Sequence, residues 1–132
     1  MSALVDQATR PELVTGTVLV VDDDDAMRET LSDILSESGY GVTAAADGDA
    51  ALDAIRTNEF DVVVMDIRMP GRDGVSVLRE VGTPPPRVIL MTAYAKERHL
   101  REARENAFAV VHKPFPVPQL LDLVASAVGA AT

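Results

Sequence analysis

Residues 62–74 read VVVMDIRMPGRDG, an apolar run that ends at Asp66 and is followed by a turn containing Pro70 and Gly71. Apolar residues in consecutive positions, rather than in every second one, indicate a strand that is covered on both faces, as in a parallel sheet flanked by helices. Four other short runs have the same character, at residues 18–21, 42–45, 88–91 and 110–111. The chain therefore contains five predicted strands.

The segments between these runs have the spacing of amphipathic helices, with apolar residues at intervals of three and four. Gly39 is a predicted stop for the first helix, and Asp49 is a predicted cap for the second. The segment 96–106 is mostly charged, with only Leu100 and Ala103 on its apolar side, so we expect a weakly held helix there. The alternation predicts an α/β fold: a five-stranded parallel sheet, doubly wound with five helices.

The length of 132 residues suits one domain. Residues 1–16 lack periodicity, and we expect a loosely ordered N-terminal extension there, followed by the domain at 17–128 and a tail at 129–132. The chain has no Cys, which excludes disulfides, thiolate metal sites and Cys nucleophiles. Oxygen, His and Lys chemistry remains.

Charge and hydropathy restrict the partners further. The formal net charge of −9 repels nucleic-acid phosphates, so we expect no direct nucleic-acid binding and favour cationic ligands. No apolar run approaches the ~20 residues of a membrane span, and the N-terminus does not have the pattern of a secretory signal. A cytoplasmic protein without a membrane segment is the expectation.

In doubly wound sheets, ligands bind beyond the carboxyl ends of the strands. The residues that follow the predicted strands are therefore the candidate site. They are Asp22, Asp23, Asp24 and Asp25 after the first strand, Asp66 after the third, Thr92 after the fourth, and His112 and Lys113 after the fifth. Acidic, hydroxyl and ammonium groups are thus predicted to meet at one edge of the sheet.

Clustered carboxylates repel one another unless a cation neutralises them or one stays protonated. A divalent ion with oxygen ligands removes this repulsion, and Mg²⁺ typically takes one or two carboxylates together with waters and phosphate oxygens. Lys113 can pair with phosphate, and the Thr92 hydroxyl can donate a hydrogen bond to it. These residue types together favour a site for a phosphorylated carboxylate.

Simpler structural roles account for the remaining polar residues. Asp24 and Asp25 are interpreted as acids of a helix N-terminal turn, where they stabilise the helix dipole. His112 and His99 are interpreted as surface residues, because the sequence around them contains no pair with metal-ligand spacing.

Four segments in order, VLVVDDDD, VVVMDIRMPGRDG, VILMTA and HKPF, resemble the receiver domains of two-component response regulators. The resemblance covers residues 17–128 and implies the flavodoxin-like receiver fold. It further implies that Asp66 is the phosphoacceptor and that Mg²⁺ is held by Asp22, Asp23, Asp66 and the backbone carbonyl of Arg68. In the same way, Thr92 and Lys113 match the residues that contact the phosphoryl oxygens. The Lys113–Pro114 bond matches one that is usually cis.

The resemblance also implies a function. Asp66 would take phosphate from the phosphohistidine of a sensor histidine kinase and later lose it to water, as a signalling domain with self-catalysed transfer and autodephosphorylation rather than an enzyme. The surface of the fourth helix, fifth strand and fifth helix would then change. It would act on a downstream effector or on a fused output domain absent from this chain, and phosphorylation-dependent dimerisation is compatible with this scheme.

Two positions depart from the family pattern. The aromatic switch residue of the family lies three residues before Lys113, where this chain has Val110; Phe108 is displaced by two residues. Thr92 and Lys113 are also about one residue closer together than is usual, which indicates a shortened fourth helix or adjoining loop.

Other functions fit the sequence less well. An unphosphorylated receiver-like scaffold predicts a degraded acidic pocket, whereas the key positions are intact. A nucleotide hydrolase would require a phosphate loop of the G-x-x-x-x-G-K type, which the chain lacks. An EF-hand requires alternating oxygen ligands between helices, and a flavin carrier of the same architecture would have phosphate-binding Ser, Thr or Gly where the first strand is followed by acids.

Overall fold

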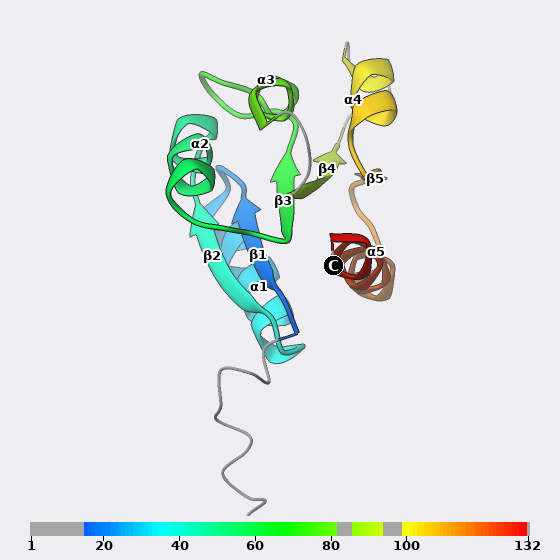
Figure 1. Cartoon of the computed structure of the whole chain (residues 1–132). Coiled ribbons are helices and arrows are strands. Elements are labelled where there is room, and N and C mark those ends of the chain that lie inside the picture. Colours follow the sequence, from blue (N-terminus) through cyan, green and yellow to red (C-terminus); the bar gives the residue numbers. More distant parts are fainter. Residues whose placement is uncertain (1–14, 82–85, 94–98, 132) are drawn as a thin grey trace, which may run out of the picture.

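The computed structural model describes residues 15–81, 86–93 and 99–131. Its centre is a parallel sheet with the strand order β2-β1-β3-β4-β5. The arrows of β1, β2 and β3 run the same way in Figure 1. The strands are β1 (Thr17–Val21), β2 (Gly41–Ala45), β3 (Val62–Asp66), β4 (Arg87–Thr92) and β5 (Ala109–His112). Each contains one of the five apolar runs, so the predicted strands are confirmed.

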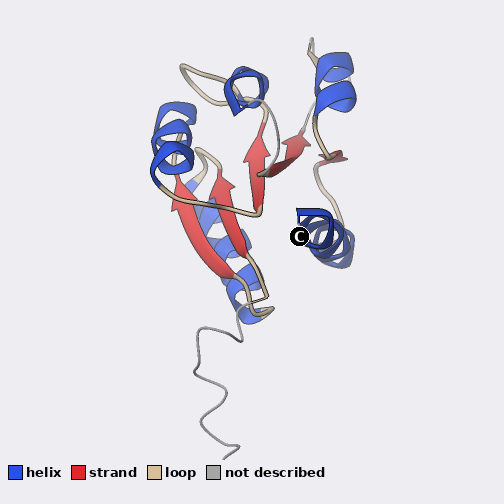
Figure 2. Ribbon diagram, in the orientation of Figure 1, coloured by secondary structure: helices blue, strands red, loops and turns tan. Residues whose placement is uncertain are grey.

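Helices cover both faces of this sheet (Figure 2). They are α1 (Asp25–Glu37), α2 (Gly48–Thr57), α3 (Gly74–Val81), α4 (Leu100–Asn106) and α5 (Val117–Ala131). Alternate residues of β3 enter two separate cores: Val63 and Met65 pack with α2, α3 and α4, whereas Val62 and Val64 pack with α1 and α5. The doubly wound α/β fold predicted from the sequence is confirmed.

The helix ends follow the local polar residues. Asp24 caps α1, where its carboxylate accepts hydrogen bonds from the backbone N–H groups of Ala26 and Met27. This agrees with the interpretation of Asp24 as an acid of a helix N-terminal turn. Gly39 follows the end of α1 with a φ of 100°, which a glycine adopts without strain. The expected cap of α2 was wrong: Asp47 caps this helix, and Asp49 lies in its first turn.

The ends of the domain can be compared with the expected boundaries. Thr15 donates to the carbonyl of Gly39, and Gly16 accepts from the N–H of Gly41, so these two residues are joined to the turn before β2. Residues 1–14 of the predicted extension lie outside the described part, as do 96–98 of the segment expected to form the fourth helix. At the other end, α5 continues to Ala131, so residues 129–131 of the predicted tail are helical.

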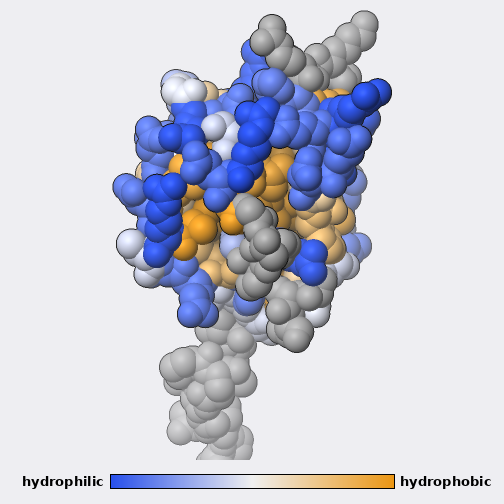
Figure 3. Space-filling view, turned by 45° about the horizontal axis from the view of Figure 1, so that its top comes forward, coloured by the Kyte–Doolittle hydropathy of each residue, from blue (hydrophilic) through white to orange (hydrophobic). Residues whose placement is uncertain are grey.

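The space-filling view in Figure 3 shows a surface dominated by hydrophilic residues, with hydrophobic residues visible between them. Within the described residues, none of the helices combines the length and apolar composition that crossing a membrane requires.

Candidate functional site

The register of the sheet brings the predicted site residues together at its carboxyl edge. Val21 of β1 is paired with Met65 of β3, which places the following residues, Asp22 and Asp66, at the same level. Asp66 is in turn paired with Met91, the residue before Thr92. Side chains from three strand ends therefore share one edge of the molecule.

Lys113 joins this group from the segment after β5. Its Nζ donates to Asp66 Oδ2 at 3.0 Å and to Asp22 Oδ2 at 3.2 Å. Asp22 is fully buried, and the side chain of Lys113 is 18% exposed. One ammonium group thus contacts two carboxylates that lie 91 and 47 positions away in the sequence.

Asp22, Asp23 and Asp66 form a group that can hold a metal ion. Each offers one carboxylate oxygen, and these oxygens lie within 4.8 Å of one another. Asp22 is buried, whereas Asp23 is exposed, so the group opens toward solvent. Three carboxylates and one ammonium leave about two uncompensated negative charges if all are ionised. An oxygen-lined, negatively charged site of this kind fits a hard divalent cation such as Mg²⁺.

The ionisation of the site reflects burial and charge together. Burial raises the pKa of the Asp66 carboxyl, and the nearby charge of Asp22 acts in the same direction. The hydrogen bond from Lys113 and the bond with the Arg68 backbone oppose this rise without cancelling it. Burial alone would lower the pKa of Lys113, but the hydrogen bonds and charges of Asp66 and Asp22 outweigh burial and raise it. Lys113 is therefore a cation at neutral pH.

Thr92 and Arg68 lie next to the acidic group. Thr92 is the last residue of β4 and is 1% exposed, and its carbonyl accepts from the N–H of Lys113 at 2.7 Å. Arg68 is exposed, two residues after Asp66. The Lys113–Pro114 peptide bond is cis, as the resemblance implies. The structure therefore gathers the site residues expected from the sequence around Asp66.

Arg28 of α1 also lies in this region, although no sequence motif indicates it. Its NH1 group donates to the backbone carbonyl of Asp22 at 2.7 Å, and its NH2 group pairs with Asp25. The three-residue spacing between Asp25 and Arg28 signals the ion pair, because residues i and i+3 are neighbours on a helix. The contact with Asp22 depends on the loop before α1, which the spacing does not reveal.

The two histidines differ in their surroundings. His112 is exposed, as expected, with its Nε2 atom 3.3 Å from an Arg104 nitrogen. His99 is half-buried and lines a surface hollow of about 520 Å³ together with the loop after β3, which is compatible with its interpretation as a surface residue.

Val110 and Phe108, the two residues considered for the switch position, pack on opposite faces of the sheet. Val110 is partly buried against the core shared with α2, α3 and α4. Phe108 packs with the core of α1 and α5, and the guanidinium of Arg87 lies 5.9 Å from its ring centroid. Phe108 therefore does not occupy the space beside Val110.

This fold and this acidic site define a phosphoacceptor signalling domain. The family model described as "Response regulator receiver domain" matches residues 18–125, which is most of the chain. The chain belongs to the receiver domains of two-component response regulators.

The comparisons with individual proteins agree. The chain is 42% identical over 111 residues to the response regulator protein FleR of Pseudomonas aeruginosa, covering 82% of this chain and 24% of FleR. It is 34% identical over 110 residues to the sporulation initiation phosphotransferase F of Bacillus subtilis, covering 81% of this chain and 89% of that protein. Among solved structures, the response regulator TrrA of Thermotoga maritima, in complex with Mg(2+)-BeF, has a TM-score of 0.77 at 33% identity. This match covers 85% of this chain and 98% of TrrA.

The relatives differ in length. The chain spans 24% of FleR and 58% of the transcriptional regulatory protein FixJ of Bradyrhizobium diazoefficiens, whereas it spans most of the sporulation protein. The family assignment therefore concerns the receiver domain and not the further parts of the longer relatives.

Proposed function

We propose that Asp66 is the phosphoacceptor of this receiver domain and that its modification requires Mg²⁺. The observation that carries the proposal is the group of three carboxylate oxygens from Asp22, Asp23 and Asp66, with the Lys113 ammonium hydrogen-bonded beside it. Asp22, Asp23, Asp66 and the backbone carbonyl of Arg68 would hold the ion. When bound, Mg²⁺ supplies positive charge that offsets the carboxylates and the incoming phosphoryl oxygens.

The residues of the chain have distinct parts in the reaction. An Asp66 carboxylate oxygen attacks the phosphorus of a kinase phosphohistidine, the P–N bond breaks, and the electron pair leaves with the imidazole, which takes up a proton. Lys113 offsets negative charge on the transferred group, and the Thr92 hydroxyl donates to one of its oxygens. Water later attacks the phosphorus, the Asp66–phosphate bond breaks, and inorganic phosphate leaves.

The proposed partners follow from this chemistry. A sensor histidine kinase supplies the phosphoryl group, and the surface formed by α4, β5 and α5 acts on a downstream effector or a fused output domain, or pairs with a second copy after phosphorylation. The net charge of −9 favours an output through such partners over direct contact with nucleic acid. The relatives include the DNA-binding transcriptional regulator NtrC of Klebsiella pneumoniae, of which the chain spans 25%.

Intact mass spectrometry after incubation with a small phosphodonor tests the proposal. The chain should gain one phosphoryl group in the presence of Mg²⁺ and none in excess chelator, and the matched Asp66→Asn variant should gain none. An unphosphorylated scaffold would show no gain in any sample. Equal modification of the wild type and Asp66→Asn would mean that the acceptor is misassigned.

A further inference from the structure

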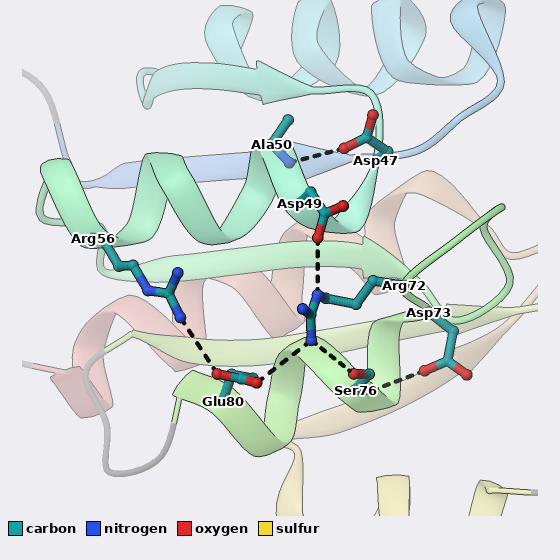
Figure 4. Close-up of polar contacts among 8 residues, drawn as sticks. All are labelled: Asp47, Asp49, Ala50, Arg56, Arg72, Asp73, Ser76 and Glu80. Carbon is teal, nitrogen blue, oxygen red and sulfur yellow. Dashed lines mark hydrogen bonds and ion pairs between the residues drawn. The ribbon is translucent and has the colours of Figure 1, made fainter.

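Arg72 connects the loop after β3 to two helices. Its Nε donates to Asp49 Oδ1 of α2 at 3.0 Å. Its NH1 group donates to Ser76 Oγ at 3.2 Å and to Glu80 Oε2 at 3.4 Å, both on α3. Figure 4 shows the guanidinium between these two helices, with Asp49 on one side and Ser76 and Glu80 on the other. One side chain therefore links the loop, α2 and α3.

The loop that carries Arg72 is continuous with the acceptor. It begins directly after Asp66 and closes where the N–H of Gly74 donates to the carbonyl of Ile67 at 2.8 Å. A Cβ atom at Gly74 would lie 2.5 Å from the Asp66 carbonyl oxygen, so the start of α3 packs directly on the acceptor backbone. Within the loop, the Arg68 backbone is hydrogen-bonded to the Asp66 carboxylate. Movement of the loop therefore moves groups that contact the acceptor.

The backbone of Arg72 is held as well as its side chain. A Cβ atom at Gly48, the first residue of α2, would lie 2.5 Å from the Arg72 carbonyl oxygen. The start of α2 thus packs against the loop at the residue whose guanidinium pairs with Asp49. The side chain of Arg72 is only 33% exposed, although Asp49 is 79% exposed. The helix and the loop are joined at this point by close packing and by an ion pair.

We propose that Arg72 is a positioning residue, which holds the loop after β3 so that Asp66 and the Arg68 backbone are arranged for Mg²⁺ before the ion binds. The inference rests on the proposed function, because it concerns the same metal site. Arg72 does not belong to the acidic group and acts through the loop. A loop that is ordered in advance does not lose conformational freedom on binding, so its anchors increase affinity without contacting the ligand.

The structure provides a matched control. Arg56 of α2 pairs with the other oxygen of Glu80 at 3.3 Å, so it joins the same two helices. Among the described residues, Arg56 has no hydrogen bond or ion pair to the loop. Arg56→Gln and Arg72→Gln each remove one arginine from the same network (Figure 4). If Arg72 acted only by pairing α2 with α3, the two variants would behave alike.

Calorimetric titration with MgCl₂ alone, without a phosphodonor, measures the predicted difference. We expect Arg72→Gln to weaken Mg²⁺ binding about fivefold, the factor by which an exposed ion-pair network can shift an equilibrium, and Arg56→Gln to stay within about twofold of the wild type. Hydrogen exchange of the Gly74 amide in the metal-free protein should be faster in Arg72→Gln than in Arg56→Gln. Arg72→Lys, which keeps one charge but not the branched geometry, should recover part of the affinity.

The outcomes separate the two proposals. If the wild type binds Mg²⁺ and Arg72→Gln matches Arg56→Gln in both affinity and Gly74 exchange, the positioning role is refuted while the metal site stands. If the wild type itself does not bind Mg²⁺, the proposed function fails and the inference fails with it. If Arg72→Gln does not fold, Asp49→Asn removes the link between loop and α2 from the other side, and unchanged Mg²⁺ affinity in that variant would overturn the proposal.

Discussion

Lys113 is expected to be the main source of stability at the acidic edge in the absence of metal. Its ammonium lies 3.0 and 3.2 Å from the carboxylates of Asp66 and Asp22. At an effective dielectric constant of 20, each pair has about 5 kcal/mol of Coulomb attraction, much of which desolvation offsets. Removing one partner of a buried pair costs roughly 3–5 kcal/mol. Because the Lys113 side chain is 18% exposed, we expect Lys113→Met to lower the free energy of unfolding by the smaller value, about 3 kcal/mol.

Asp66→Asn should behave oppositely, although it removes a member of the same pair. Lys113 keeps Asp22 as a partner, and one repelling carboxylate disappears. Because burial raises the pKa of Asp66, the fold disfavours the ionised form. We therefore expect the free energy of unfolding of Asp66→Asn to equal that of the wild type within about 1 kcal/mol or to exceed it.

Urea unfolding at pH 7 in excess chelator, followed by circular dichroism, measures both effects. Circular dichroism suits this chain because it has no Trp. In thermal unfolding, the loss in Lys113→Met corresponds to a decrease in Tm of about 10 °C. Lys113→Arg, which keeps the charge, is the control and should lose less. A loss below about 1 kcal/mol in Lys113→Met, or an equal loss in Asp66→Asn, would refute the role of Lys113 as the cation that balances these carboxylates.

Three further predictions concern the metal, pH and the response. Mg²⁺ at about 100 times its Kd should raise the free energy of unfolding by about 2.7 kcal/mol. In thermal scans, Asp23→Ala should lose this increment, whereas Asp24→Ala should keep it and lose only about 1 kcal/mol of helix capping. Equal loss of the increment in both variants would contradict the metal site. Burial raises the pKa of Asp66 above 3.8, so its contribution to the free energy of unfolding is complete below pH 3.8 and is lost as the pH rises through the raised pKa. Over that interval, the metal-free wild type should lose stability relative to Asp66→Asn. A stability difference between the two that stays constant with pH would contradict this prediction. Thr92→Ala should accept phosphate but show much smaller amide chemical-shift changes than the wild type, while Val110→Ala should change stability more than the response; the reverse result would move the switch to Val110.

The strand ends were predictable because parallel strands buried on both faces have a strong local signal, as in residues 62–65. The doubly wound topology then placed Asp22, Asp66 and Thr92 at one edge without knowledge of any contact. The cap of α2 was not predictable in the same way. Asp47 and Asp49 flank Gly48, and the choice between them depends on the extended backbone of Asp47, with φ −157° and ψ 175°. Sequence alone does not specify this conformation.

Contacts between distant elements were also beyond the sequence. The contact of Lys113 with Asp22 joins positions 91 residues apart, and the Arg72 contacts join a loop to two helices. The sequence motif PGRDG predicts a turn, but whether its arginine faces solvent or a helix depends on how closely α2 approaches. At Gly48 this approach is so close that a Cβ atom would lie 2.5 Å from the Arg72 carbonyl oxygen.

The loop after β3 and the helix α4, which lie on the two sides of Asp66, differ in how firmly they are packed. This difference indicates which of them changes position on phosphorylation. On the β3 side, Gly74 packs on the Asp66 backbone, and the loop is anchored to α2. On the β4 side, Thr92 precedes a short helix, α4, which contributes only Leu100 and Ala103 to the buried residues. Phosphorylation would replace the single charge of the Asp66 carboxylate with a phosphoryl group that carries about −1.5 to −2 charges, and this group would form a new hydrogen bond with the buried Thr92 hydroxyl. Because α4 buries fewer apolar side chains than α3, the free energy of that bond is expected to move α4 and leave the loop after β3 in place.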